Sequence, residues 1–261
     1  MKEIDELLGI MQTLRDPVKG CPWDRQQTIR SILPYSLEEV YELADAVERD
    51  DLEGLRDELG DLLFHVSFYA QMASEQGGFD FTAVARSINN KLRTRHPHVF
   101  AGGEVQSVTE QTLSWEKIKQ QERKQRDRHG PLLADIHQAQ PAITRAYALQ
   151  KRAATVGFDW SGPLPVLEKV EEEVRELREA IESGKGSDAV MEELGDLIFA
   201  CVNLARHTGI NPETALRQTN RKFEQRFGYI ERQLIARGQE LTDVSLAEME
   251  VLWQEAKRND A

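Results

Sequence analysis

The sequence lacks the marks of a membrane protein and of a disulfide-rich secreted one. No run of about 18 apolar residues occurs, so neither a transmembrane helix nor a membrane partner is expected. Only two cysteines are present, Cys21 and Cys201, and they form no CxxC pair, which argues against a disulfide framework or a zinc knuckle. The first eight residues carry three acidic side chains and do not resemble a signal peptide. These absences predict a cytoplasmic protein.

Basic residues are also few relative to acidic ones. The 261 residues include 33 Lys and Arg against 45 Asp and Glu, which gives a formal net charge of −12. Such a surface repels nucleic-acid backbones, so a nucleic acid is not expected as a partner. An acidic protein still binds an anionic substrate where metal ions reverse the local field.

The chain is an internal repeat. The motif Glu-Leu-Gly-Asp-Leu occurs at residues 58–62 and again at residues 193–197. All four tryptophans fall at equivalent positions, in the pairs Trp23 with Trp160 and Trp115 with Trp253. Self-similarity of this kind predicts two homologous domains, at residues 1–120 and 140–261, joined by a charged linker at 121–139.

Helix signals dominate both repeats, and alternating strand patterns are hard to find. Apolar residues recur at spacings of three and four, as in an amphipathic helix, at Leu52, Leu55, Leu59, Leu62 and Val66. Ser36 followed by Glu39 is typical of a capping box at a helix start. The short connection at 48–51 suits an antiparallel helical hairpin. We therefore expect an all-α protein with two tandem bundles of about four helices each.

Acidic pairs on consecutive helices are the candidate metal ligands. Glu39 and Glu42 are three residues apart and share one side of their helix, as Glu58 and Asp61 do on the next. Antiparallel packing of the two helices would bring the four carboxylates together. The second repeat carries the same set, Glu173, Glu176, Glu193 and Asp196. Ligand sets made only of oxygen suit a hard cation, Mg²⁺ or Mn²⁺ in its place.

Two other interpretations of the acidic pairs compete with a metal site. Most helical Glu-x-x-Glu pairs form a solvated acidic face, but two pairs on consecutive helices, repeated in both halves, argue against that reading. A di-iron bundle would need Glu-x-x-His on two helices, and none of the six histidines has a glutamate three residues before it.

Each repeat also carries a lysine and an arginine one turn apart on the same predicted helix. The pairs are Lys91 with Arg95 and Lys222 with Arg226. Beside a metal cluster such a pair would neutralise phosphate oxygens, with arginine as a fork and lysine as a point charge. An ordinary exposed helix face is the alternative interpretation.

The last tryptophan of each repeat, Trp115 or Trp253, also has two interpretations. It stacks on a nucleobase or it anchors the core, and the pattern alone favours the core. Lys257 follows Trp253 by one turn, which makes it a candidate for a further phosphate contact.

The Glu-Glu-x-x-Glu and Glu-x-x-Asp motifs resemble the signature of the MazG nucleotide pyrophosphohydrolases, relatives of the all-α dUTP and dCTP pyrophosphatases. The resemblance runs through the whole chain, including residues 20–24, 95–100 and 156–160, and is to the full-length two-domain bacterial form. The family implies Mg²⁺-dependent hydrolysis of a nucleoside triphosphate to monophosphate and pyrophosphate, often with broad base preference. It also implies homodimers, because helices from two subunits usually complete the bundle.

The resemblance implies a role for each matching residue. The implied metal ligands are Glu173, Glu176, Glu193 and Asp196 in the second repeat and Glu39, Glu42, Glu58 and Asp61 in the first. Lys222 and Arg226 would hold phosphates, and Trp253 would lie near the base. Lys169, one turn before Glu173, would also reach the nucleotide, whereas the first repeat has Tyr35 at this position.

The expected mechanism follows from metal chemistry. Bound metal ions would neutralise phosphate oxygens and make a bound water more acidic, and that water would attack the α-phosphorus so that pyrophosphate leaves. Glu172 or Glu38 would orient the water. The second repeat is expected to be the main site, because Pro97 must disturb the helix just beyond Arg95 in the first.

Two alternative functions stay open. One is a housecleaning pyrophosphatase for one particular or damaged nucleotide. The other is a nucleotide-sensing regulator that binds a triphosphate and a protein partner without catalysis, although intact carboxylate sets in both repeats argue against it. A regulatory protein is a further candidate partner.

Overall fold

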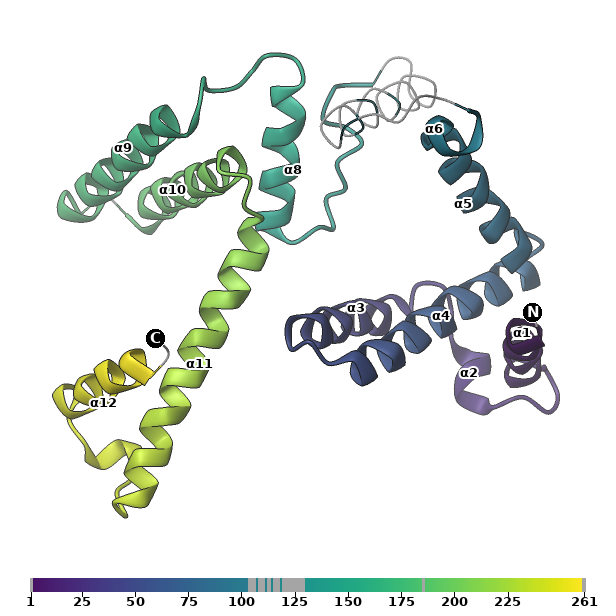
Figure 1. Ribbon diagram of the computed structural model, residues 1–261, viewed down its shortest axis with the longest axis horizontal. Helices are drawn as coiled ribbons and strands as arrows, with labels where there is room; N and C mark the ends of the chain where they lie inside the picture. Colours follow the sequence, from purple (N-terminus) through teal and green to yellow (C-terminus); the bar gives the residue numbers. More distant parts are fainter. Residues whose placement is uncertain are drawn as a thin grey trace. The chain divides into compact units, whose positions relative to one another are not determined.

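Helices make up all the regular secondary structure in the part of the chain that this computed structural model describes (Figure 1). That part comprises residues 2–102, 130–184 and 186–259, with the isolated positions 107, 111, 114 and 118. The predicted all-α class is therefore confirmed. The chain divides into two compact units, Met1–Arg126 and Asp127–Ala261. None of the described helices combines the length and apolar character needed to span a bilayer.

The first unit is built on a hairpin of two long helices, α3 and α4, which pack side by side (Figure 1). Its elements are α1 (Lys2–Leu14), α2 (Pro22–Gln26), α3 (Leu33–Glu48), α4 (Leu52–Glu75), α5 (Phe81–Arg95) and α6 (Pro97–Phe100). The Asp51 side chain accepts a hydrogen bond from the Gly54 N–H at 2.9 Å. This cap satisfies a backbone donor that the helix leaves unpaired and so fixes the start of α4.

The core of the first unit lies between α1, the start of α3 and the second half of α4. Met11, Ile32, Phe68 and Met72 are each at most 2% exposed and form one cluster. Phe68 and Met72 are one turn apart on α4 and therefore share a face. Burial of each such side chain contributes about 1.5–3 kcal/mol. The guanidinium carbon of Arg15 lies 5.4 Å from the centroid of the Phe68 ring and covers this cluster.

The start of α3 corrects one prediction. The spacing of Ser36 and Glu39 predicts an N-cap at Ser36, but the helix already begins at Leu33. Pro34 stands in the first turn, where its fixed φ and missing N–H favour helix initiation. Ser36 therefore lies inside the helix, where its Oγ donates to the Ile32 carbonyl at 3.2 Å.

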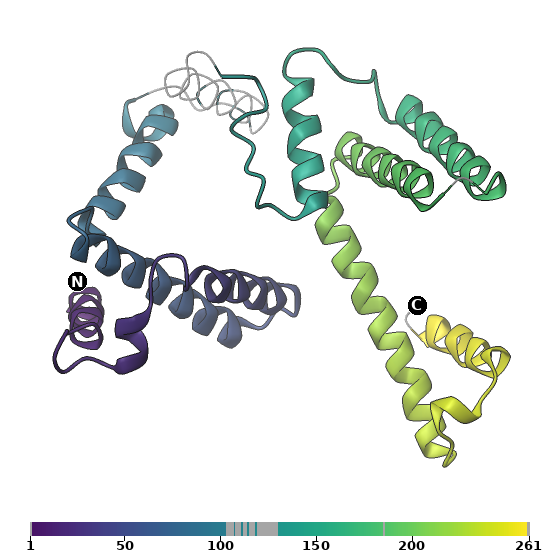
Figure 2. The ribbon, with the colours of Figure 1, turned by 180° about the vertical axis from the view of Figure 1, so that it is seen from behind.

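The second unit repeats the helical hairpin and adds a long helix that carries its last element. Its elements are α8 (Ala142–Ala154), α9 (Pro163–Glu182), α10 (Ser187–His207), α11 (Pro212–Ala236), the 3₁₀ turn η1 (Leu241–Asp243) and α12 (Leu246–Asn259). α9 packs on α10, and α12 packs on α11. In both ribbon views α12 and the half of α11 that it covers lie away from the α9–α10 hairpin (Figures 1 and 2).

Among the described residues, the two repeats differ in the helix that follows the hairpin. α5 ends at Arg95, and Pro97 starts the separate short helix α6, whereas α11 continues to Ala236 without interruption. A proline ring clashes with the preceding turn and offers no N–H to it. The prediction that Pro97 disturbs the helix beyond Arg95 is confirmed.

Candidate metal centres

Three of the four predicted carboxylates of the first repeat meet between α3 and α4. One carboxylate oxygen from each of Glu39, Glu58 and Asp61 lies within 4.8 Å of the others. Glu39 comes from α3, and the other two lie one turn apart on α4. The antiparallel hairpin therefore brings these residues together across two helices, as their spacing predicts.

The second repeat forms the same arrangement. Glu173 on α9 and Glu193 and Asp196 on α10 place one carboxylate oxygen each within 4.8 Å of the others. We call these two sets the first and the second acidic triad. The Glu173 side chain is buried, with the residue 5% exposed, so this carboxylate is held inside the hairpin rather than on a solvated face.

The fourth predicted ligand of each repeat lies at the edge of its triad. Glu42 and Glu176 stand outside the groups whose oxygens come within 4.8 Å. Each is nevertheless close enough to raise the pKa of a triad member. A helix rises about 4.5 Å over three residues, so each residue sits almost one turn along its helix from the triad glutamate. Their role as metal ligands stays a prediction.

The carboxylates of each triad are crowded and partly desolvated, which is compatible with a bound cation. Burial, followed by repulsion from neighbouring carboxylates, raises the pKa of Glu58 in the first triad and of Glu193 in the second. In addition, Glu58 Oε2 and Glu173 Oε2 are buried and have no hydrogen-bond partner among the described residues. A buried carboxylate oxygen without a partner is costly unless an ion or a water satisfies it. The residues present therefore fit a hard divalent cation.

The two triads differ in the basic group beside them. In the second, Lys169 Nζ lies 2.7 Å from Glu173 Oε1 and 2.9 Å from Glu172 Oε1. Hydrogen bonds with these two glutamates raise the pKa of Lys169, so the ammonium stays charged. Glu172, a predicted water-orienting residue, is thus paired with a lysine. Glu38, its predicted counterpart in the first repeat, is exposed on α3.

In the first triad the group beside Glu39 is an imidazole from α4 and not a lysine. His65 Nε2 lies 3.7 Å from Glu39 Oε1, and His65 Nδ1 contacts Ser36 Oγ at 3.0 Å. Ser36 Oγ also contacts the Tyr69 hydroxyl at 3.0 Å. Burial lowers the pKa of His65, although the charge of Asp61 opposes this shift. His65 is 5% exposed, so it is a buried residue of α4.

The predicted phosphate-binding residues of the second repeat lie on α11 and α12. The guanidinium carbon of Arg226 is 5.7 Å from the centroid of the Trp253 ring. The Phe223 ring packs on the same indole, with the two ring centroids 5.4 Å apart. Lys222 and Lys257 are exposed. Because α12 lies away from the α9–α10 hairpin in both views, Trp253 and the second triad are on separate helix pairs of the unit (Figures 1 and 2).

Trp253 also takes part in a hydrophobic cluster. It packs against the buried residues Ile230, Leu234 and Leu252. Its role as a core anchor is therefore visible in the structure, while its contact with a base stays a prediction. In the first repeat, Lys91 and Arg95 lie on α5, and Trp115 falls outside the described residues.

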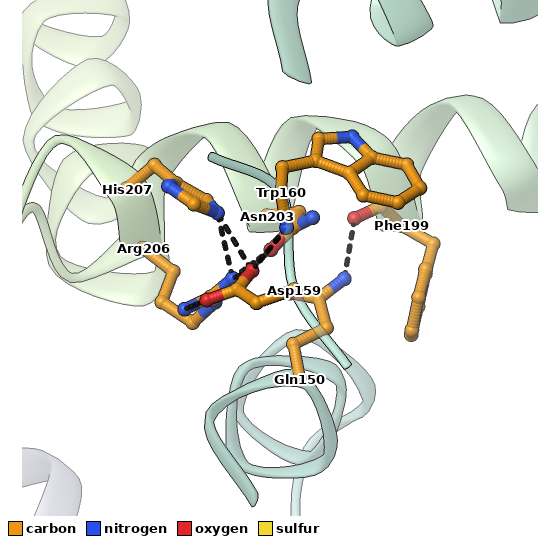
Figure 3. Close-up of polar contacts among 7 residues, drawn as sticks. All are labelled: Gln150, Asp159, Trp160, Phe199, Asn203, Arg206 and His207. Atoms are coloured by element: carbon orange, nitrogen blue, oxygen red, sulfur yellow. Dashed lines mark hydrogen bonds and ion pairs between the residues drawn. The ribbon is translucent and has the colours of Figure 1, made fainter. Parts of the chain in front are cut away.

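A polar network beside the second triad was missed from the sequence. The Asp159 carboxylate accepts hydrogen bonds from the Arg206 guanidinium and from the Trp160 N–H, the latter at 2.9 Å (Figure 3). His207 Nε2 lies 2.8 Å from Asp159 Oδ1. The Arg206 hydrogen bond is the main cause that lowers the pKa of Asp159. Arg206 also donates to Asn203 Oδ1 at 3.0 Å. The one available signal was the pairing of Trp160 with Trp23, which marks the segment but not its partners.

The architecture is therefore that of an all-helical protein with two tandem units, each with an acidic triad suited to a divalent cation. The profile of the MazG nucleotide pyrophosphohydrolase domain matches residues 27–100 and 162–229, and these two ranges contain both triads. The chain belongs to the MazG family of nucleotide pyrophosphohydrolases.

Two full-length relatives agree with this assignment. A nucleoside triphosphate pyrophosphohydrolase of Escherichia coli K12 is 51% identical over 261 residues, which cover 100% of this chain and 99% of that protein. The nucleoside triphosphate pyrophosphohydrolase/pyrophosphatase MazG of Thermotoga maritima is 41% identical over 256 residues, covering 98% and 96%.

Proposed function

We propose that this protein is a Mg²⁺-dependent nucleoside triphosphate pyrophosphohydrolase of broad base preference, which converts a ribo- or deoxyribonucleoside triphosphate and water to the monophosphate and pyrophosphate. The observation that carries this proposal is the unsatisfied, buried carboxylate oxygen in each triad, Glu58 Oε2 and Glu173 Oε2. Both lie within the segments that match the MazG domain, and the full-length relatives are pyrophosphohydrolases. A cytoplasmic location belongs to the same proposal.

The second triad would hold the ion through Glu173, Glu193 and Asp196, with Glu176 as a further ligand. Mg²⁺, or Mn²⁺ in its place, supplies charge neutralisation of phosphate oxygens and a more acidic bound water. Lys169 is already charged and in contact with Glu173, so its ammonium needs only to turn to meet a phosphate oxygen.

Glu172 is the group proposed to orient the attacking water. Its carboxylate lies one residue from Glu173 and is 42% exposed, so it is accessible to water as well as to Lys169. The oxygen of the water forms a bond to the α-phosphorus, and the bond from that phosphorus to the bridging oxygen breaks. The proton passes to the carboxylate, and pyrophosphate leaves with both bonding electrons.

A homodimer is part of the proposal. Large apolar side chains on the hairpin of the second unit stay more than two-fifths exposed: Leu164, Leu167, Val174, Ile181, Met191, Leu194, Ile198 and Phe199. An apolar surface of this kind on a helical hairpin is typical of a subunit interface. The separation of Trp253 from the second triad fits the same arrangement, since the partner subunit's α11 and α12 would then bring Lys222 and Arg226 to the triphosphate.

Product analysis tests the reaction. Purified protein is incubated with each common triphosphate, with Mg²⁺ or with EDTA, and the nucleotides and phosphates are separated. The proposal expects metal-dependent release of monophosphate and pyrophosphate in a one-to-one ratio. Diphosphate and orthophosphate would place the attack at the γ-phosphorus and refute the mechanism. Binding of the triphosphate without turnover would favour a nucleotide-sensing regulator, and turnover of one substrate alone would favour the housecleaning enzyme.

A further inference from the structure

The imidazole of His65 stands beside the first acidic triad and meets it at Glu39. His65 follows Asp61 by one turn on α4, so the two side chains lie on the same face of that helix. The histidine is 5% exposed, and its Nε2 lies 3.7 Å from Glu39 Oε1 on α3. The contact therefore joins the two helices that carry the triad, which pack side by side (Figure 1).

The hydrogen bonds of Ser36 fix the tautomer of this imidazole. Ser36 Oγ lies 3.2 Å from the Ile32 carbonyl oxygen and 3.0 Å from His65 Nδ1. The Tyr69 hydroxyl is its third contact, also at 3.0 Å. A hydroxyl has one proton and two lone pairs, and a carbonyl oxygen only accepts. All three contacts are hydrogen bonds only if Ser36 donates to the carbonyl and accepts from the imidazole Nδ1–H and from the tyrosine O–H. The proton of the neutral ring is therefore on Nδ1.

This tautomer leaves a lone pair on His65 Nε2, on the side of the ring that faces the triad. The nearest triad atom, Glu39 Oε1, is a second acceptor, and 3.7 Å is too long for a hydrogen bond. Two acceptors that face each other in a largely buried place are unfavourable unless a cation or a proton donor lies between them. Two ligand atoms held about 2.0–2.2 Å from one ion are about 3–3.8 Å apart, depending on the angle between them. The observed separation fits two ligands of a shared ion.

The second repeat has no counterpart of this polar network. Alignment of the two repeats on their shared motifs gives apolar residues at the three corresponding positions, Val170 for Ser36, Ala200 for His65 and Leu204 for Tyr69. Packing of the helical hairpin therefore does not require polar groups there. The imidazole and the two hydroxyls that hold it occur together only beside the first triad.

A nitrogen ligand changes the ion that a carboxylate site prefers. Imidazole suits first-row transition metals, whereas Mg²⁺ prefers ligand sets made of oxygen. A neutral histidine binds metal through one ring nitrogen while the other donates a hydrogen bond that fixes the orientation of the ring. The Nδ1–H bond to Ser36 provides this second interaction.

We propose that His65 Nε2 is a nitrogen ligand of the cation held by the first triad, and that Ser36 is the positioning residue that keeps the ring in the binding tautomer. The first triad is then a mixed nitrogen and oxygen site. It binds a first-row transition-metal ion, such as Mn²⁺ or Co²⁺, in preference to Mg²⁺, and the ion joins α3 to α4. Only the binding of a cation at the first triad is shared with the proposed function, so the hydrolysis of a triphosphate is tested separately.

Pulsed electron paramagnetic resonance of bound Mn²⁺ tests the ligand directly, because a coordinated nitrogen nucleus modulates the electron spin echo. Full-length Glu193→Gln protein is the background, in which the second triad is disabled, and no nucleotide is added. His65→Gln or Ser36→Ala is introduced into this background. His207→Gln is the matched control, because His207 Nε2 also lies close to a carboxylate, at 2.8 Å from Asp159, but outside both triads. Calorimetry gives the affinity of each protein for Co²⁺ and for Mg²⁺.

The background protein and the control should show nitrogen modulation, and His65→Gln should lack it. Co²⁺ affinity should fall at least about tenfold in His65→Gln, whereas Mg²⁺ affinity should change less than about twofold. Ser36→Ala should lower Co²⁺ affinity by about tenfold, as loss of a group that orients a ligating histidine does. If His65→Gln does not fold, as judged by circular dichroism, the background protein is instead labelled with the heavy nitrogen isotope in histidine. The modulation should then change to that of the heavy isotope.

Other outcomes overturn the inference. A background protein without nitrogen modulation, or with modulation that histidine labelling leaves unchanged, would show that the ring is not a ligand. Modulation that persists in His65→Gln would assign the nitrogen to another group. Equal weakening of Co²⁺ and Mg²⁺ binding would make His65 a packing residue. Nitrogen modulation in a protein that releases no pyrophosphate would support the inference and refute the proposed reaction, whereas release without modulation would refute the inference alone.

Discussion

Lys169 Nζ lies 2.7 Å from Glu173 Oε1, one turn further along α9, and this ion pair places a permanent positive charge against the second acidic triad. The first triad has Tyr35 at the lysine position and the buried His65 near Glu39. Burial lowers the pKa of His65, so this group is neutral near pH 7. The two triads have equivalent carboxylates but differ in the charge of the group beside them.

Replacement of Lys169 by methionine should affect metal and nucleotide in opposite directions. Loss of the ammonium removes a charge that competes with the ion for Glu173, so Mn²⁺ should bind about fivefold more tightly, as expected for a partly exposed ion pair. The affinity for tripolyphosphate should fall, because a phosphate contact is lost. Calorimetric titrations with Mn²⁺ and with tripolyphosphate measure both effects. Tyr35→Phe is the control, and weaker Mn²⁺ binding by Lys169→Met would show that the lysine positions Glu173 instead.

The contribution of each repeat to turnover can be separated with matched ligand variants. Glu193→Gln should lower metal-dependent turnover by more than about 100-fold, because it removes a direct metal ligand. Mutation of residues that only hold the ligands in place already lowers activity or metal affinity by about 10–100-fold. Glu58→Gln makes the same change in the first triad and should leave most of the turnover intact. Steady-state release of pyrophosphate from both variants is the measurement. Unchanged activity in Glu193→Gln would contradict the ligand assignment.

The helical class and the members of the acidic triads could be predicted from sequence periodicity and from the spacing of the carboxylates. Helical periodicity and the repeat were sufficient for the all-α class, and spacings of three residues placed Glu58 with Asp61 and Glu193 with Asp196. These features depend on local geometry, which a sequence pattern reports directly. The position of Ser36 was wrong because Pro34 starts α3 a turn earlier than the side-chain pattern indicates.

The surroundings of the triads depend on contacts between distant segments, which a single sequence does not report. Gln150 meets the carbonyl of Phe199 across 49 residues, and Arg206 meets Asp159 across 47. Nothing in the local pattern of α8 distinguishes Gln150 from a solvated glutamine. Likewise, the length of α11, which separates Trp253 from the triad, follows from the absence of a helix breaker and not from any motif.

Binding of Mg²⁺ should become stronger as the pH rises through the acidic range. Burial and neighbouring carboxylates raise the pKa of Glu193, so its proton competes with the metal at pH values above the ordinary glutamate pKa of 4.5. In the metal-free protein a rise in pH has the opposite effect, because it lowers the stability of the fold. A raised folded-state pKa gives stability that is present below 4.5 and lost as the pH rises through the shifted value.

Thermal unfolding between pH 4 and 8, in EDTA and in Mg²⁺, measures both effects. In EDTA the loss of stability with rising pH should be smaller in Glu193→Gln than in wild type, because the variant has no group to titrate. The stabilisation by Mg²⁺ should grow with pH in wild type. Identical pH profiles for the two proteins in EDTA would contradict the raised pKa.

The ion pair between Arg206 and Asp159 should stabilise the second unit. The two side chains are only 13% and 25% exposed, and Asp159 also holds the Trp160 N–H. Asp159→Ala leaves the guanidinium partly buried without its main partner, which should lower the free energy of unfolding by about 2 kcal/mol. Asp57→Ala removes an exposed partner of Arg56 and should change it by less than about 0.5 kcal/mol. Urea unfolding followed by tryptophan fluorescence measures both, and equal effects of the two variants would refute the structural role of Asp159.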